Sequence, residues 1–146
     1  MLPASFYDWL AKHSPTIARW SLFLVYFWFG ILKVFNLSPA EELVTALQHQ
    51  TIPFIPSDFF LVAFGFFECL IGVLFLVKGA EKIVFPLFII HIITTTLPLF
   101  LLSSFTWQYW LVPTLTGQYI IKNIVLVAVA IYVVRDWRSS NNAAIG

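Results

Sequence analysis

The stretch FFLVAFGFFECLIGVLFLV, residues 59–77, decides the fold. About 20 consecutive apolar residues carry one helix across a bilayer, so this stretch predicts a membrane span. Its only charged residue is Glu68, close to the middle. An ionised side chain at the centre of a bilayer costs at least ~2.5 kcal/mol. We therefore expect Glu68 to turn away from lipid, and to be protonated or paired with another polar residue.

The composition of the whole chain places it among helical membrane proteins. Hydrophobic residues make up 60% of the 146 residues and charged residues only 10%, too few to cover a soluble domain of this size. The apolar–polar alternation of an outer-membrane barrel is absent. The net charge of +1 gives no sign of a nucleic-acid partner, and the single cysteine, Cys69, excludes an internal disulfide or a Cys-x-x-Cys pair.

Hydropathy predicts one domain, 1–146, folded as a four-transmembrane-helix bundle. The expected spans are about 16–35, 59–77, 83–102 and 119–134. The first outer loop holds Ser38-Pro39-Ala40-Glu41, a helix-start pattern with proline at the first helical position. It predicts a short interfacial helix that runs to about Gln50. Residues 103–118 carry no charge but several aromatic rings, and this indicates an aromatic belt or a re-entrant segment.

The distribution of lysine and arginine predicts the orientation. Four spans put both termini on one side of the membrane, and cytoplasmic segments are richer in these residues. Six of the eight lie on the side of the termini and two, Lys33 and Lys122, on the other. Both termini are therefore expected in the cytoplasm. The six are Lys12, Arg19, Lys78, Lys82, Arg135 and Arg138.

The polar residues of the spans are the candidates for a site around Glu68. His91 lies in the middle of the third span, and Lys33 and Lys122 lie near the outer ends of the first and fourth. Either Glu68 and His91 handle a proton, or they hydrogen-bond between helices as a packing device. Either the lysines form a cationic rim for a ligand headgroup, or they extend outward as ordinary membrane anchors.

Helical periodicity adds further residues to this set. Tyr26 shares a stripe of the first span with Lys33, and either joins the site or packs. Asn123 follows Lys122 at the start of the fourth span. Small residues let helices approach closely, so three glycines are expected to pack helices together. They are Gly30, Gly65 and Gly72.

Several other kinds of site lack a signal in the sequence. The histidines lie in different segments, and no His-x-x-x-His or Glu-x-x-His pair specifies a metal. Only one histidine lies in a span, whereas a haem would want two axial ligands there. No metal is therefore predicted.

Three short motifs follow one another along the chain. They are Arg19…Gly30-x-x-Lys33, Gly65-x-x-Glu68-x-x-x-Gly72 and Gly117-Gln118-Tyr119-Ile120-Ile121-Lys122-Asn123. In this order and spacing they resemble the DoxX superfamily of small four-helix membrane proteins, and most closely its YkgB/RclC group. The resemblance covers roughly residues 15–135 and implies a four-helix bundle in the bacterial inner membrane. For the RclC-like members it implies a role in surviving reactive chlorine. One DoxX relative is a subunit of a thiosulfate:quinone oxidoreductase, which suggests a quinone ligand.

The sequence leaves three functions open. The first is an inner-membrane protein of oxidant stress or redox homeostasis that binds a quinone-like, lipid or small anionic ligand around Glu68. The second is a non-catalytic scaffold or subunit of another membrane protein, which would use the aromatic segment 103–118 and the helix at 38–50 as contact surfaces. The third is a small transporter acting as an oligomer, although four spans are few for alternating access. Besides the bilayer, a second copy of the chain is an expected partner.

Overall fold

Four helical segments in the computed structural model are long and apolar enough to cross a membrane. They are Ala4–Val34, Ser57–Leu76, Glu81–Leu101 and Leu115–Asn142, and each contains or overlaps one predicted span. The structure describes residues 3–145, and side chains as far as residue 142. The predicted all-α, multi-pass architecture is confirmed at this level.

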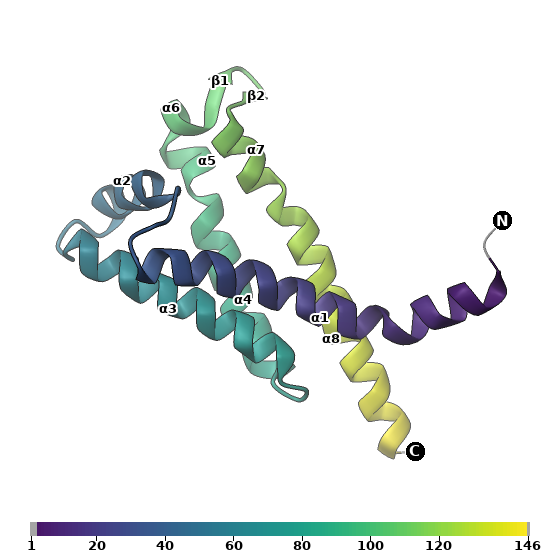
Figure 1. Cartoon of the computed structure of the whole chain (residues 1–146). Helices are drawn as coiled ribbons and strands as arrows, with labels where there is room; N and C mark the ends of the chain where they lie inside the picture. Colours follow the sequence, from purple (N-terminus) through teal and green to yellow (C-terminus); the bar gives the residue numbers. More distant parts are fainter. Residues whose placement is uncertain (1–2, 146) are drawn as a thin grey trace.

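Helix α1, Ala4–Val34, is longer than the predicted first span because it continues through Pro15. Proline has no N–H, so the carbonyl of Ala11, four residues earlier, loses its helical partner. The hydroxyl of Ser14 donates to that carbonyl at 3.1 Å, which replaces the lost bond. The first turns of α1 project beyond the rest of the bundle (Figure 1).

Helices α1 and α3 (Ser57–Leu76) lie antiparallel and side by side, and they cross α4 (Glu81–Thr96) and α8 (Asn123–Ile145) obliquely (Figure 1). The three glycines expected to pack helices together all lie in the α1–α3 contact. All four helices contribute to one buried apolar cluster. Its members are Leu22, Tyr26, Ile71, Phe75, Val84, Phe88, Ala130 and Val133.

Short elements gather at one end of the bundle, which we call the α2 end (Figure 1). A helix, α2 (Glu41–Thr51), lies in the loop where a short interfacial helix is predicted, and its place at the interface stays a prediction. It begins after Ala40, where the Ser38 hydroxyl accepts the Ala40 N–H instead of capping a longer helix. The third span ends in a separate turn after Pro98. The remaining elements are α5 (Pro98–Leu101), α6 (Ser103–Thr106), β1 (Trp107–Tyr109), β2 (Val112–Pro113) and α7 (Leu115–Ile121).

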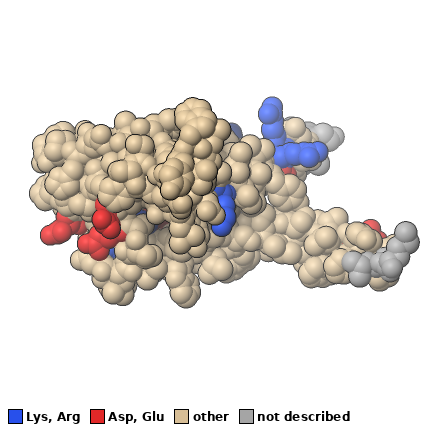
Figure 2. All heavy atoms as spheres, turned by 90° about the horizontal axis from the view of Figure 1, so that it is seen from above, with Lys and Arg blue, Asp and Glu red and all other residues tan. Residues whose placement is uncertain are grey.

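The uncharged segment 103–118 therefore forms α6, a small antiparallel hairpin and the start of α7. The fourth span begins at Leu115 and α8 continues to Ile145, so it extends beyond the predicted 119–134 at both ends. Charged side chains are few over the face in Figure 2, and they gather in small groups. A surface with few charged side chains is compatible with a helix bundle that faces lipid.

Candidate functional site

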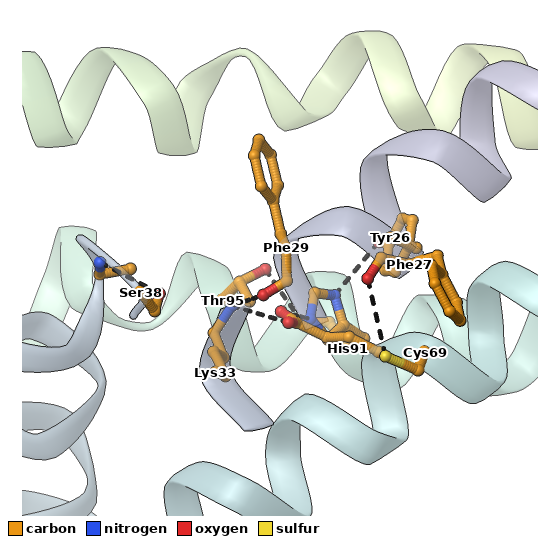
Figure 3. Close-up of polar contacts among 10 residues, drawn as sticks. Tyr26, Phe27, Phe29, Lys33, Ser38, Cys69, His91 and Thr95 are labelled. Carbon is orange, nitrogen blue, oxygen red and sulfur yellow. Dashed lines mark hydrogen bonds and ion pairs between the residues drawn. The ribbon is translucent and has the colours of Figure 1, made fainter. Parts of the chain in front are cut away.

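Four buried polar side chains from three helices form one hydrogen-bonded chain (Figure 3). The Lys33 ammonium donates to Glu68 Oε2 at 2.7 Å. Glu68 Oε1 lies 2.9 Å from His91 Nε2, and His91 Nδ1 lies 3.1 Å from the Tyr26 hydroxyl. Only 3–6% of each of these residues is exposed. We call this set, Tyr26, Lys33, Glu68 and His91, the buried network.

With a neutral His91 and an ionised Glu68, every contact in the network has a donor and an acceptor. A neutral imidazole has one donor and one acceptor nitrogen. If His91 Nε2–H donates to Glu68, its Nδ1 can accept the Tyr26 hydroxyl proton, and the carboxylate receives both Lys33 and His91. In the described part of the chain, no buried side-chain nitrogen or oxygen lacks a partner. In this arrangement Lys33 carries a positive and Glu68 a negative charge, so the network has no net charge.

Aromatic rings from α1 and α3 pack against the His91 ring of the network. The His91 ring stacks on Phe64 with centroids 5.2 Å apart, and the Tyr26 ring meets it edge-on at 5.0 Å. Lys33 Nζ lies 5.8 Å from the Phe64 centroid, a geometry that adds a cation–π attraction. The ion pair is therefore removed from solvent, where both the attraction and the cost of an unpaired charge are large.

Glycines in α1 and α3 bring the network together. Gly30 lies one turn from both Tyr26 and Lys33, and Gly65 lies one turn before Glu68. A Cβ added at Gly65 would lie 2.9 Å from the Lys33 Cβ, so the two helix backbones touch where the ion pair forms. Lys33 turns into the bundle instead of outward, and Tyr26 and Gly30 on the same stripe of α1 are buried with it.

Lys122 and Asn123 do not join the buried network. Lys122 is exposed, and its ammonium lies 4.9 Å from the Tyr119 ring centroid. The inward residue of this segment is Ile120, and two residues along a helix turn the side chain by about 200°. Lys122 consequently faces outward at the junction of α7 and α8. Asn123 is half-buried and makes no side-chain hydrogen bond to the network.

A second buried ion pair lies toward the turn between α3 and α4. Arg19, expected mainly to set topology, donates Nη1 to the Phe75 carbonyl at 3.0 Å and Nη2 to Glu81. The other Glu81 oxygen accepts the Gly79 N–H at 2.7 Å. The signal for the pair is that Arg19 lies seven residues before Tyr26, on the same stripe of α1.

The four side chains of the network are almost fully buried, and the two most distinct hollows of the structure lie elsewhere. One open hollow lies against α2, between Ser38 and His49, and an apolar one lies on α1 between Thr16 and Leu24. Neither is lined by a residue of the network. Within the described residues, no group of three or more histidine, cysteine or acidic side chains could hold a metal ion. A ligand would reach Glu68 only after side chains move.

Together these features define a class: an α-helical, multi-pass membrane protein with a charged network sealed inside its bundle. No family model, curated protein or solved structure matches the chain.

Proposed function

We propose that the protein binds and releases a proton at the buried network, in a redox or oxidant-stress role in a bacterial inner membrane. The observation that carries this proposal is the unbroken chain of hydrogen bonds from Tyr26 through His91 and Glu68 to Lys33. Ionisable residues inside a membrane are rare, and such chains are the usual material of proton relays.

The geometry lets the network accept one proton with little movement. A proton added to His91 Nδ1 turns that nitrogen from acceptor to donor, and the Tyr26 hydroxyl then has only to rotate and accept. Glu68 already lies 2.9 Å from the opposite nitrogen and stabilises the imidazolium. The backbone and the Lys33–Glu68 pair stay in place.

Charge balance suggests what accompanies the proton. The protonated network carries a net charge of +1 in a buried site, which is unfavourable unless negative charge arrives nearby. A small anion or the oxygens of a quinone-like headgroup would supply it. The resemblance to the DoxX superfamily also suggests a quinone. Of the residues expected around such a headgroup, Lys33 lies in the network and Lys122 lies outside it.

The proposed orientation follows from the lysine and arginine distribution, six residues against two, with both termini cytoplasmic. The α2 end then faces the outside, and Lys33, one residue before the end of α1, is the member of the network closest to that end of its helix. Protons and ligand are proposed to exchange from this side.

A complementation experiment tests the role of Glu68. A strain that lacks the gene is challenged with hypochlorous acid and supplied with wild type, Glu68→Gln or Glu81→Gln. The control removes a carboxylate from the other buried ion pair with the same chemical change. Protein levels in the membrane are measured for each, because either change can destabilise the bundle.

The expected result is protection by wild type and by Glu81→Gln, and loss of protection by Glu68→Gln at equal membrane levels. Protection by Glu68→Gln equal to wild type would show that Glu68 only packs, and the scaffold function would then lead. Absence of protection by wild type would remove the oxidant-stress role. Quinone measured in a lipid extract of the mildly solubilised protein tests the ligand separately.

A further inference from the structure

The hairpin between the third and fourth spans ends in a tip of four large side chains that touch little of the protein. Tyr109 is 77% exposed, Trp110 87%, Leu111 70% and Val112 47%. The tip lies in the segment 103–118, which has no charged residue. Exposed apolar groups that gather in this way mark a surface that meets something other than water.

The base of the hairpin is firmly held, so the exposed tip is a defined feature. Trp107 Nε1 donates to the Leu99 carbonyl at 2.9 Å, which ties β1 to α5. At the base of the hairpin, the N–H of Thr114, which follows β2, donates to the carbonyl of Thr106, which precedes β1, at 2.9 Å. Gly117 lies so close to the Thr106 backbone that α7 and α6 are in direct contact. The structure therefore holds the tip away from the bundle.

The backbone at the tip is strained at Leu111, a residue with a large apolar side chain. Leu111 has φ of 57°, a left-handed conformation. This conformation costs a residue with a Cβ roughly 1–2 kcal/mol, and turns normally place glycine or asparagine there. A turn exposed to water gains nothing from leucine at this position. A turn that meets an apolar medium gains the transfer of that side chain.

Two constraints together determine which layer, water, lipid headgroups or hydrocarbon, surrounds the tip. Four large apolar or aromatic side chains are unfavourable in bulk water. The bilayer core is excluded in turn, because an irregular backbone exposed to hydrocarbon leaves N–H and C=O groups without partners. The β1–β2 ladder has a register irregularity and only a few residues. The remaining layer is the lipid headgroup interface, where tryptophan and tyrosine are enriched.

The surfaces beside the hairpin point to the same layer. The hairpin joins two of the four membrane-spanning segments. The third segment ends at Leu101, and the fourth begins at Leu115. Phe100 on one side and Tyr119 on the other are 77% and 62% exposed. In the sequence, the tip lies between these two exposed aromatic residues, in the connection that joins the two spans.

We propose that the tip, residues 109–112, is an interfacial anchor that inserts into the phospholipid headgroup layer of the membrane that holds the bundle. Trp110 and Tyr109 lie at headgroup depth, and Leu111 reaches the first acyl carbons. The anchor fixes the depth of the α5–α7 connection. This anchoring role requires that the chain cross a membrane, and it is independent of any chemistry at Glu68.

Site-directed spin labelling of the full chain tests the depth of the tip. Cys69 is the only cysteine, so Cys69→Ala gives a cysteine-free background. A label is placed by Trp110→Cys, or by Tyr109→Cys as a second variant in case the first does not fold. Leu70→Cys on the exposed face of α3 gives the lipid reference, and Ser139→Cys gives the water reference. All variants are reconstituted in phosphatidylcholine–phosphatidylglycerol vesicles.

The ratio of relaxation by oxygen to relaxation by a nickel chelate measures depth. The anchor predicts a ratio at 109 or 110 between the two references and at least several-fold above that of position 139. A ratio equal to that of position 139 places the tip in water and overturns the proposal, and a ratio equal to that of position 70 overturns the interfacial depth. A label shielded from both reagents overturns it in favour of a protein contact.

Discussion

Gly30 and Gly65 face each other so closely that neither position has room for a side chain. A Cβ built on Gly30 would lie 2.6 Å from the Gly65 carbonyl oxygen, and one on Gly65 would lie 2.7 Å from the Gly30 carbonyl oxygen. Both neighbours are backbone atoms of a helix and cannot move aside. This mutual contact sets the separation of α1 and α3 at the level of the Lys33–Glu68 pair.

Replacement of either glycine by alanine should therefore separate the two helices. Gly30→Ala and Gly65→Ala are each expected to lower the free energy of unfolding by about 1–3 kcal/mol or more, as overpacking does. Thermal unfolding in mild detergent measures the loss. Val73→Ile adds one carbon to the exposed side of α3 and should leave stability unchanged. Stability equal to wild type in both alanine variants would contradict the close contact.

The Lys33–Glu68 pair should behave as one unit in a double-mutant cycle. Removal of one partner of a buried pair leaves a charge without compensation and costs about 3–5 kcal/mol. Lys33→Met and Glu68→Gln should each approach that loss, whereas the double variant should recover most of it because no lone charge remains. Unfolding in detergent at one pH gives the four free energies. Simple addition of the two losses would mean that Lys33 extends outward in the folded protein.

Arg19 should not be replaceable by lysine. Its two nitrogens reach separate acceptors, the Phe75 carbonyl and Glu81, and a single ammonium cannot keep both in the same geometry. Arg19→Lys is expected to lower the free energy of unfolding by about 1–3 kcal/mol. It should also speed amide exchange in the turn 77–80. Arg138→Lys, at an exposed position, is the matched control and should change neither quantity.

The sequence predicts the elements that depend on local periodicity and span length. The apolar stretch around Glu68 and the stripe through Tyr26, Gly30 and Lys33 follow from helix geometry, and the structure places these residues together. Depth and face leave open whether Lys33 turns toward Glu68 or extends outward, and the structure shows Glu68 in contact with both Lys33 and His91. Their chemical role is a separate question, and it stays a prediction.

Other features depend on contacts between segments that no periodicity encodes. Lys122 faces outward in the segment where α7 packs on α6 through Gly117 and Thr106. The Arg19–Glu81 pair depends on how the α3–α4 turn meets α1. The continuation of α1 through Pro15 is instead accompanied by a contact within the helix, the hydrogen bond from the Ser14 hydroxyl to the Ala11 carbonyl.

Gln48 provides the last example of such a contact, and it predicts how the loop after α2 is held. This glutamine is 1% exposed, and its side-chain nitrogen donates at 2.8 Å to the carbonyls of both Ile52 and Ile55. Its oxygen accepts the Ser57 hydroxyl at 2.9 Å. One amide group therefore closes the loop onto the first residue of α3.

Gln48→Ala should leave the Ile55 carbonyl without its donor and the Ile52 carbonyl with the Ile55 N–H alone. Helix α2 itself should persist, because its backbone bonds do not involve the amide. A buried group left unpaired costs about 1–3 kcal/mol, so the loop 52–56 should open before the bundle unfolds. Limited proteolysis and amide exchange in detergent should show faster cleavage and exchange there, with little change in α3. Gln50→Ala, an exposed residue of the same helix, is the control. Equal protection of the loop in both variants would show that Gln48 does not hold it.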